Sequence, residues 1–213
     1  MENRAVKIQS KKNPNVVMRI INGHFATNHS HINYFVDMTM LKARQKEAQG
    51  AASVLAARYE STTIVDSIIC MDGCEVIGAY LAEELTKVGI MSINQHQTIY
   101  IATPEIHTGG QLIFRDNMLP TIRGKHVLLL IANATTGKTL EKALECIQYY
   151  GGDLVGVSAI FSAVSHIHGQ EINSIFTAED IPDYFSCPAG KCPLCAARRP
   201  VDAIVNSYGY SKI

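Results

Sequence analysis

The sequence of 213 residues has no excess charge of either sign and no long apolar run. Lys and Arg together number 19, as do Asp and Glu, so the formal net charge is +0. A broad basic face for nucleic acid or anionic lipid is therefore not expected. No apolar run approaches the roughly 20 residues of a membrane helix, and residues 1–12 lack the apolar stretch of a signal peptide. These absences predict a cytoplasmic protein that does not enter membranes and has no nucleic-acid partner.

Internal repeats and low-complexity stretches are also absent, and the 47% of hydrophobic residues suffice for one globular core. Disulfides are not expected in a reducing cytoplasm. Three of the six cysteines lie in apolar or helical patterns and are expected to be buried thiols: Cys70, Cys74 and Cys146. The other three cluster near the C-terminus, in a segment that also contains proline and glycine: Cys187, Cys192 and Cys195.

Short apolar runs alternate with segments of helical period. The runs predict strands over 16–21, 62–71, 97–102, 111–114, 126–131, 154–161 and 171–176. Helices are predicted over 38–59 and 76–88 and between the strand at 126–131 and Gly151, with loops over 22–33 and 103–110. This order predicts an α/β fold with a mainly parallel, twisted sheet flanked by helices. A ligand would then bind at the C-terminal ends of the strands.

The most informative segment is 126–139, where an apolar strand ends in Ala-Thr-Thr-Gly-Lys-Thr and a helix begins. Backbone N–H groups and the dipole at a helix N-terminus favour an anion, and three threonine hydroxyls add donors. We therefore predict a phosphate cradle, with an ordinary capped turn as the alternative. The loop nearly matches the P-loop of triphosphatases, but Ala132 replaces the first glycine and no acid ends the next strand, at 154–161.

The same segment resembles the signature of type I phosphoribosyltransferases, in which an apolar strand runs through two acids into a Thr-Thr-Gly loop. Residues 23–37 are similar to the N-terminal region of orotate phosphoribosyltransferases, which approaches the base. Residues 66–82 resemble their pyrophosphate-binding strand, loop and helix, and Cys192-Pro-Leu-Cys195 resembles the tail of the longer members. The resemblance spans roughly residues 16–200 and implies the type I phosphoribosyltransferase fold.

The resemblance also implies roles for individual residues. The 5′-phosphate of phosphoribosyl pyrophosphate would lie on Ala134, Thr135, Thr136, Gly137, Lys138 and Thr139. Its pyrophosphate, with magnesium, would lie along Met71, Asp72, Gly73, Cys74 and Glu75. The base would approach Phe25, Asn33 and Tyr34. The mobile loop, 104–110, would bring His107 to the reaction, and Arg115 would supply a cation.

The sequence departs from the family pattern at several of these places. The paired acids that hold the ribose hydroxyls fall at Ile131 and Ala132, and Asn133 beside them offers only a neutral substitute. The loop over 103–110 contains no lysine. Asp72 and Glu75 are as consistent with helix capping as with magnesium binding. A divergent enzyme and a non-catalytic sensor both fit these departures, and restoring acids at positions 131 and 132 would distinguish them.

The terminal cysteines have a spacing that suits a tetrahedral zinc, since Cys192 and Cys195 form a CxxC motif. Three thiolates are not four ligands, so a fourth would come from His166, His168 or another subunit. The alternative is that the cysteines bind no metal. Two His-x-His pairs, 29–31 and 166–168, are expected to be solvent-facing loop histidines.

We therefore predict a phosphoribosyltransferase-like domain over 1–185 and a cysteine-containing tail over 186–213. Within the domain, 16–37 would form an N-terminal hood and 62–176 the core sheet. The predicted function is transfer of ribose 5-phosphate between phosphoribosyl pyrophosphate and a nucleobase, with orotate and pyrimidine synthesis as the best guess. The alternatives are a sensor of phosphoribosyl pyrophosphate or a nucleoside monophosphate, and a P-loop-like triphosphatase. The family resemblance further implies a homodimer.

Overall fold

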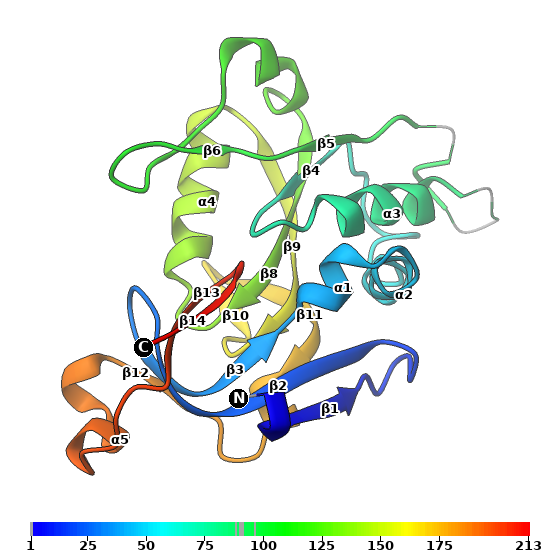
Figure 1. The fold of residues 1–213 in the computed structure, drawn as a ribbon. Coiled ribbons are helices and arrows are strands. Elements are labelled where there is room, and N and C mark those ends of the chain that lie inside the picture. Colours follow the sequence, from blue (N-terminus) through cyan, green and yellow to red (C-terminus); the bar gives the residue numbers. More distant parts are fainter. Residues whose placement is uncertain (1, 88, 90–91, 96) are drawn as a thin grey trace.

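A computed structural model describes residues 2–87, 89, 92–95 and 97–213. Its larger sheet has the order β10-β11-β9-β8-β4-β5 (Figure 1). The strands are β4 (Ser67–Cys70), β5 (Tyr100–Ala102), β8 (His126–Ala134), β9 (Asp153–Ser162), β10 (His166–Ile167) and β11 (Gln170–Thr177). Every pairing is parallel except the short β10–β11 hairpin. The predicted α/β fold with a mainly parallel sheet is thereby confirmed.

Helices cover both faces of this sheet because its strands are apolar on both sides. The helices α1 (Thr39–Ala43), α2 (Gln45–Ala56) and α3 (Glu75–Thr86) pack on one face, and α4 (Lys138–Tyr149) packs on the other (Figure 1). The prediction of one helix over 38–59 was wrong, since Arg44 is extended (φ −95°, ψ 124°) and separates α1 from α2. Val88, the last residue of the predicted 76–88 helix, lies outside the described residues.

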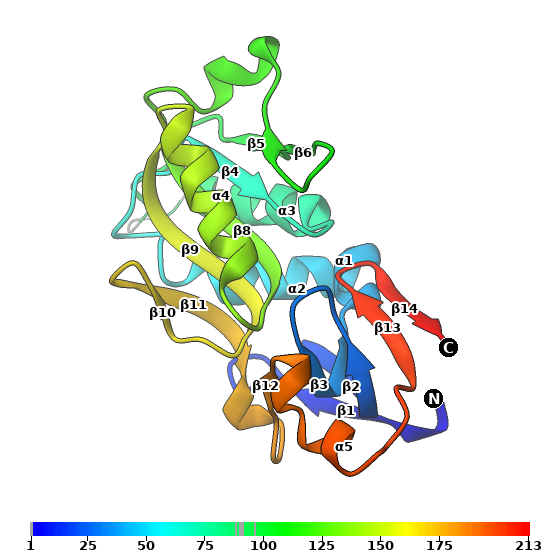
Figure 2. The ribbon, with the colours of Figure 1, turned by 90° about the vertical axis from the view of Figure 1, so that its left-hand side faces the viewer.

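A second sheet has the order β12-β3-β2-β13-β14, with β1 also paired to β2 (Figure 2). Its strands are β1 (Ala5–Gln9), β2 (Val17–Ala26), β3 (His31–Asp37), β12 (Ser186–Cys187), β13 (Ala203–Asn206) and β14 (Gly209–Lys212). The predicted loop over 22–33 is therefore wrong, because most of it belongs to the β2–β3 hairpin. A bulge between Asn22 and Phe25 interrupts the alternation that would have marked the strand. We call this second sheet the hood sheet. The tail over 186–213 supplies three of its strands, β12, β13 and β14.

The remaining elements are short. The predicted loop over 103–110 contains β6 (Glu105–Ile106), which forms a hairpin with β7 (Leu112–Ile113). The other short elements are η1 (Glu2–Arg4), η2 (Asp116–Thr121), η3 (Ala178–Asp180), η4 (Ala189–Lys191) and α5 (Pro193–Ala196). Among the described residues, none of the helices has the length and apolarity needed to cross a membrane.

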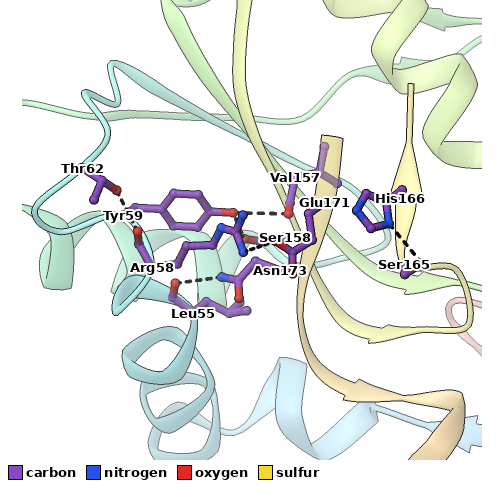
Figure 3. Close-up of polar contacts among 10 residues, drawn as sticks. All are labelled: Leu55, Arg58, Tyr59, Thr62, Val157, Ser158, Ser165, His166, Glu171 and Asn173. Atoms are coloured by element: carbon purple, nitrogen blue, oxygen red, sulfur yellow. Dashed lines mark hydrogen bonds and ion pairs between the residues drawn. The ribbon is translucent and has the colours of Figure 1, made fainter. Parts of the chain in front are cut away.

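Polar contacts fix the C-terminal end of α2 to β9 and β11 of the sheet (Figure 3). The buried Tyr59 hydroxyl lies 2.9 Å from Ser158 Oγ and donates to the Val157 carbonyl at 3.2 Å. Asn173 Nδ2 donates to the Leu55 carbonyl at 3.1 Å. Hydrogen bonds to buried backbone carbonyls satisfy groups that packing alone would leave unpaired. These bonds therefore fix the position of α2 relative to β9 and β11.

A carboxylate joins β4 to β8 at their N-terminal ends. Asp66 Oδ2 accepts hydrogen bonds from the His126 backbone N–H at 2.8 Å and from His126 Nδ1 at 2.7 Å. Burial acts to raise the pKa of Asp66, but these hydrogen bonds and the charge of His126 outweigh it, and the pKa lies below its usual value. A depressed carboxyl pKa stabilises the fold above the unfolded pKa and loses that contribution as pH falls through the folded value.

We therefore expect Asp66→Asn to lower the free energy of unfolding at pH 7 by less than about 1 kcal/mol, because the pair is partly exposed. The difference from the unsubstituted protein should shrink below about pH 4, where the unfolded carboxyl becomes protonated. Urea unfolding at pH 7 and pH 3 measures both quantities. Asp153→Asn, an exposed carboxyl at the start of β9, is the control. A pH-independent difference for Asp66→Asn would contradict the assignment.

Candidate phosphate-binding site

The predicted phosphate loop lies between the end of β8 and the start of α4. Gly137 is the N-cap residue of α4 and has a left-handed conformation (φ +78°). Thr135 is half-buried, while Thr136 and Thr139 are exposed. The first N–H groups of α4 have no partners within the helix and, with its dipole, favour an anion at this end. The loop thus has the features of an anion site.

This loop forms one wall of a cavity of about 180 Å³. The second wall is the turn between β2 and β3, and the third is the tip of the β13–β14 hairpin, both of which lie near the N-terminal end of α4 in Figure 2. The lining residues are Thr27, Asn28, His29, Ser30, Ile32, Phe35, Asp72, Asn133, Thr135, Thr136, Thr139, Val205, Asn206 and Ser207. Segments far apart in sequence therefore meet around the predicted phosphate loop.

Asn133 places an unused polar atom at this cavity. Its side-chain oxygen Oδ1 is buried and has no hydrogen-bond partner among the described residues. A buried acceptor without a partner costs about 1–3 kcal/mol, which a ligand hydroxyl would relieve. Lys138, by contrast, is exposed and does not line the cavity, although a P-loop lysine has to reach the phosphates.

The predicted pyrophosphate loop follows β4 and contains two consecutive left-handed residues, Asp72 (φ +59°) and Gly73 (φ +76°). Lys42 of α1 holds this loop, since its Nζ donates to the Asp72 carbonyl at 2.7 Å and to the Ser207 carbonyl at 2.6 Å. The Lys42 ammonium is thus a cation beside the pyrophosphate loop that sequence reasoning missed. No local pattern identifies Lys42, because its partners are 30 and 165 residues away.

The other side chains of this loop are mostly buried or already hydrogen-bonded within the protein. Burial raises the pKa of Asp72, although hydrogen bonding by the Ser207 side chain, the charge of Lys42 and the Asn133 backbone N–H act against it. Glu75 Oε1 accepts from Thr103 Oγ1 at 3.0 Å. Met71 and Cys74 are buried. Of the five predicted pyrophosphate residues, only Asp72 lines the cavity.

The hairpin corresponding to the mobile loop lies away from the cavity. Arg115 makes a bidentate ion pair with Glu105, with an Nη2–Oε2 distance of 2.7 Å. His107 is exposed, and neither it nor Arg115 lines the cavity. The hairpin tip borders a separate hollow of about 580 Å³ against α4, where Lys142 Nζ approaches the Gly110 carbonyl at 3.5 Å. In this conformation the structure does not bring the predicted catalytic pair to the phosphate loop.

The three residues predicted to approach a base do not line the cavity either. Phe25 is fully buried and packs against Phe35, with ring centroids 6.1 Å apart. Tyr34 packs against the main apolar cluster. Asn33 Nδ2 donates to the Asp183 carbonyl, and its Oδ1 accepts from the Phe185 N–H. Because the sequence predicts a loop over 22–33, where the structure has most of the β2–β3 hairpin, no local pattern shows which of these side chains face the cavity.

Cavity residues contributed by the hood are instead those of its turn, Thr27 to Ser30, together with Ile32 and Phe35. At the positions of the family's acid pair, Ile131 and Ala132 are 0% and 1% exposed. Ile131 packs among the residues under α4, whereas Ala132 packs on the other face of the sheet. Asn133 is therefore the polar residue of β8 that lines the cavity.

Behind the hood turn, two histidines meet two cysteines. The cluster consists of His24 of β2, His31 of β3, and Cys192 and Cys195 at α5, whose nitrogen and sulfur atoms all lie within 4.8 Å of one another. His31 is thus not the solvent-facing loop residue predicted. Cys187 lies outside this group, as do His166 and His168, the expected sources of a fourth ligand. The approach of the two histidines to the cysteines was not predicted, because both lie within 22–33, where the sequence predicts a loop rather than paired strands.

Electrostatics within this histidine–cysteine cluster favour a neutral His31 imidazole and a Cys192 thiolate, whereas burial, and then the neighbouring Cys192, raise the pKa of Cys195. Burial, and then the charge of His24, lower the pKa of His31. Burial acts to raise the pKa of the Cys192 thiol, but hydrogen bonds from the backbone N–H groups of Cys195 and Leu194 outweigh it, and the pKa lies below its usual value.

The family resemblance implies magnesium, but the residues that line the cavity do not include a set of oxygen ligands for it. Asp72 is the one carboxylate among the residues that line it. Among the described residues, the histidine–cysteine cluster is the one grouping of potential metal ligands, and it contains no carboxylate. Magnesium prefers oxygen ligands in octahedral geometry, so the residues of this chain do not by themselves fit a dedicated magnesium site.

The sequence matches no family model and no curated protein. Similarity to known proteins is found only when the structure is compared with solved structures. Orotate phosphoribosyltransferase from Mycobacterium tuberculosis H37Rv aligns over 76% of this chain and 91% of its own, with 14% identity and a TM-score of 0.53. The Aeropyrum pernix orotate enzyme aligns over 75% and 88%, with 13% identity and a TM-score of 0.53. Adenine phosphoribosyltransferase from Leishmania tarentolae aligns over 71% and 80%, with 12% identity and a TM-score of 0.50. This divergent chain therefore has the fold of the type I phosphoribosyltransferases.

Proposed function

We propose that this protein is a phosphoribosyltransferase-like enzyme that binds phosphoribosyl pyrophosphate or a nucleoside monophosphate in the 180 Å³ cavity. The observation that carries the proposal is the N-terminus of α4, which opens at a cavity lined by Thr135, Thr136 and the unpaired side chain of Asn133. The backbone N–H groups and threonine hydroxyls would bind the 5′-phosphate. The ribose hydroxyls would then meet Asn133.

In the proposed reaction, a nucleobase nitrogen attacks the anomeric carbon of the ribose as its bond to the pyrophosphate oxygen breaks. The base loses the proton of that nitrogen, and pyrophosphate leaves with both electrons of the broken bond. Charge that develops on the leaving group has to be stabilised by positioned cations. Lys42 is beside the pyrophosphate loop, and we expect magnesium to enter on the substrate's own phosphate oxygens.

Orotate is our best guess for the base, and the hood turn would contact it. His29 and Asn28 of that turn line the cavity and can donate hydrogen bonds to ring carbonyl or carboxylate oxygens. His107 and Arg115 take part only when their hairpin swings from α4 to the cavity and Arg115 exchanges Glu105 for the pyrophosphate. Such loop movements complete the site in many enzymes.

A specific observation favours a second candidate, a sensor that binds the same ligand without turnover. Ile131 and Ala132 are buried apolar residues, and Arg115 is neutralised by Glu105. A site with a phosphate cradle but no free cation in the loop binds without accelerating pyrophosphate departure. We propose no triphosphatase activity, because Lys138 does not line the cavity.

Calorimetric titration with phosphoribosyl pyrophosphate and magnesium, followed by orotate or adenine while pyrophosphate release is measured, distinguishes these candidates. Binding with release supports the enzyme, and binding without release for either base supports the sensor. Absence of binding would refute both. Asn133→Leu should weaken binding about tenfold, the loss of one hydrogen bond of roughly 1.4 kcal/mol. Its thermal stability should not fall, because the replaced oxygen has no partner in the free protein.

A further inference from the structure

We propose that His24, His31, Cys192 and Cys195 bind one Zn²⁺ ion that fastens the hood hairpin to the C-terminal segment. The ligand atoms are His24 Nε2, His31 Nδ1 and the two cysteine sulfurs. Two imidazoles and two thiolates are a ligand set that tetrahedral zinc prefers. This site differs from the three-cysteine set suggested by the sequence, and it is separate from the phosphate cavity and its chemistry.

Three nitrogen–sulfur distances within the cluster match a tetrahedral ion. His24 Nε2 lies 3.5 Å from Cys192 Sγ and 3.6 Å from Cys195 Sγ, and His31 Nδ1 lies 3.3 Å from Cys195 Sγ. Bonds of about 2.0–2.1 Å to nitrogen and about 2.3 Å to sulfur place nitrogen and sulfur about 3.5 Å apart in a tetrahedron. The two nitrogens are 2.9 Å apart and would separate by about 0.4 Å around the ion.

Hydrogen bonds from surrounding groups orient the proposed ligand side chains for a metal. His24 Nδ1 lies 2.9 Å from the Arg199 carbonyl, which can only accept, so Nδ1 carries the proton and Nε2 is the free lone pair. Metal-ligating histidines are oriented by such a contact in most proteins. The backbone N–H groups of Leu194 and Cys195 face the Cys192 sulfur, and Pro193 opens the turn between the cysteines. The CxxC turn therefore presents both sulfurs on one side.

Four protein ligands leave no open coordination position, so the site is structural rather than catalytic. His24 is fully buried and Cys192 is 3% exposed, and two thiolates neutralise a divalent ion at little cost in buried charge. The 4.8 Å spread of the four ligand atoms accommodates one ion. The chemistry and the compactness together favour a single zinc.

The location of the site suggests what the ion does. His24 precedes and His31 follows the turn whose residues Thr27 to Ser30 line the phosphate cavity. Cys192 is 168 residues from His24 in sequence. A cross-link between such distant segments restricts the unfolded chain and stabilises the fold. The zinc would thereby hold one wall of the cavity in place.

Metal analysis of the protein purified without chelators tests the proposal. We expect about one zinc per chain in the unsubstituted protein and about a tenth of that or less in Cys195→Ala and His31→Ala. Cys195→His, which keeps a ligand, should retain the ion. Cys187→Ala is the matched control, because Cys187 contacts the Cys192 thiol and lies 3.9 Å from the His31 carbonyl but is not one of the four proposed ligands. Loss of zinc in Cys187→Ala equal to that in Cys195→Ala would overturn the ligand set.

Two measurements on the unsubstituted chain keep the proposal testable if a variant fails to fold. Replacement of zinc by Co²⁺ should give the visible absorption of a tetrahedral ion and a near-ultraviolet thiolate band. Chelation should lower the melting temperature by at least about 10 °C, reversibly on return of zinc but not of magnesium. Amides of residues 27–30 should then exchange at least about tenfold faster. A chain that takes up neither zinc nor cobalt, or that holds iron instead, would refute the proposal.

Discussion

Ile131→Asp should unfold the protein or bring it close to unfolding at neutral pH. The side chain of Ile131 is 0% exposed and lies in the apolar cluster between β8 and α4. The substitution removes buried aliphatic volume, at about 2–5 kcal/mol, and buries a carboxyl without a partner, at about 1–3 kcal/mol or more. The sum of about 5 kcal/mol is comparable with the whole stability of many domains.

The charge part of this effect can be separated from the volume part by pH. A carboxyl at this place would have a raised folded pKa, so its destabilisation should be smaller near pH 4 than at pH 8. Ile131→Val, which removes one methyl group, should cost only about 0.5–1.5 kcal/mol and show no such pH dependence. Urea unfolding of both variants decides the matter. A well-folded Ile131→Asp at pH 8 would mean that residue 131 faces the cavity, as the family's first acid does.

This expectation changes how the enzyme and the sensor can be told apart. Restoring both acids, the experiment that the sequence suggests, would report on folding rather than on catalysis. Ala132 borders a small hollow of about 10 Å³ beside Asn133, so only Ala132→Asp could direct a carboxyl toward the ribose. The two positions of the family's acid pair thus hold buried apolar residues in this chain, and Asn133 is the polar residue beside them that lines the cavity.

The core of the fold was predictable because its signals are local. Strands such as β8 and β9 are continuous apolar runs, and glycine and the Thr-Thr-Gly loop mark the ends of α4. Parallel order follows from strand–helix alternation. The strand–loop–helix junction between β8 and α4 was predictable for the same reason, since the N-terminus of a helix after a buried strand is defined by consecutive residues.

The hood sheet and the histidine–cysteine cluster depend on contacts that no local pattern contains. Residues 22–33 read as a loop because polar residues and a bulge interrupt alternation in β2. β13 pairs with β2 across about 180 residues, with Ala203 opposite Phe25. His24, His31 and Lys42 acquire their partners only through strand pairing in the hood sheet and through the packing of α1. Such residues look ordinary in sequence, which is why the site's cation and two proposed metal ligands were missed.

Gly137→Val should strongly weaken the proposed phosphate binding while leaving the protein folded. Gly137 caps α4 at φ +78°, a conformation that costs a residue with a β-carbon about 1–2 kcal/mol and a β-branched one more. Space is not the obstacle, since an added Cβ would lie 3.9 Å from Ile167 Cδ1. The loop should relax toward negative φ and turn its N–H groups from the anion, weakening binding of phosphoribosyl pyrophosphate about 100-fold, or 2.7 kcal/mol.

The opposite end of the same helix provides the control. Gly151 follows α4 with φ +77°, and an added Cβ there would meet only the flexible Arg123 side chain at 3.7 Å. Gly151→Val should therefore carry a similar strain and a similar loss of thermal stability, with binding measured by calorimetry unchanged. Equal weakening in both variants would show that general loosening of α4, rather than the geometry of its N-terminus, governs affinity. Unchanged binding in Gly137→Val would show that the N-terminus of α4 does not hold the phosphate and would direct attention to the Asp72 loop, which also lines the cavity and leads into α3.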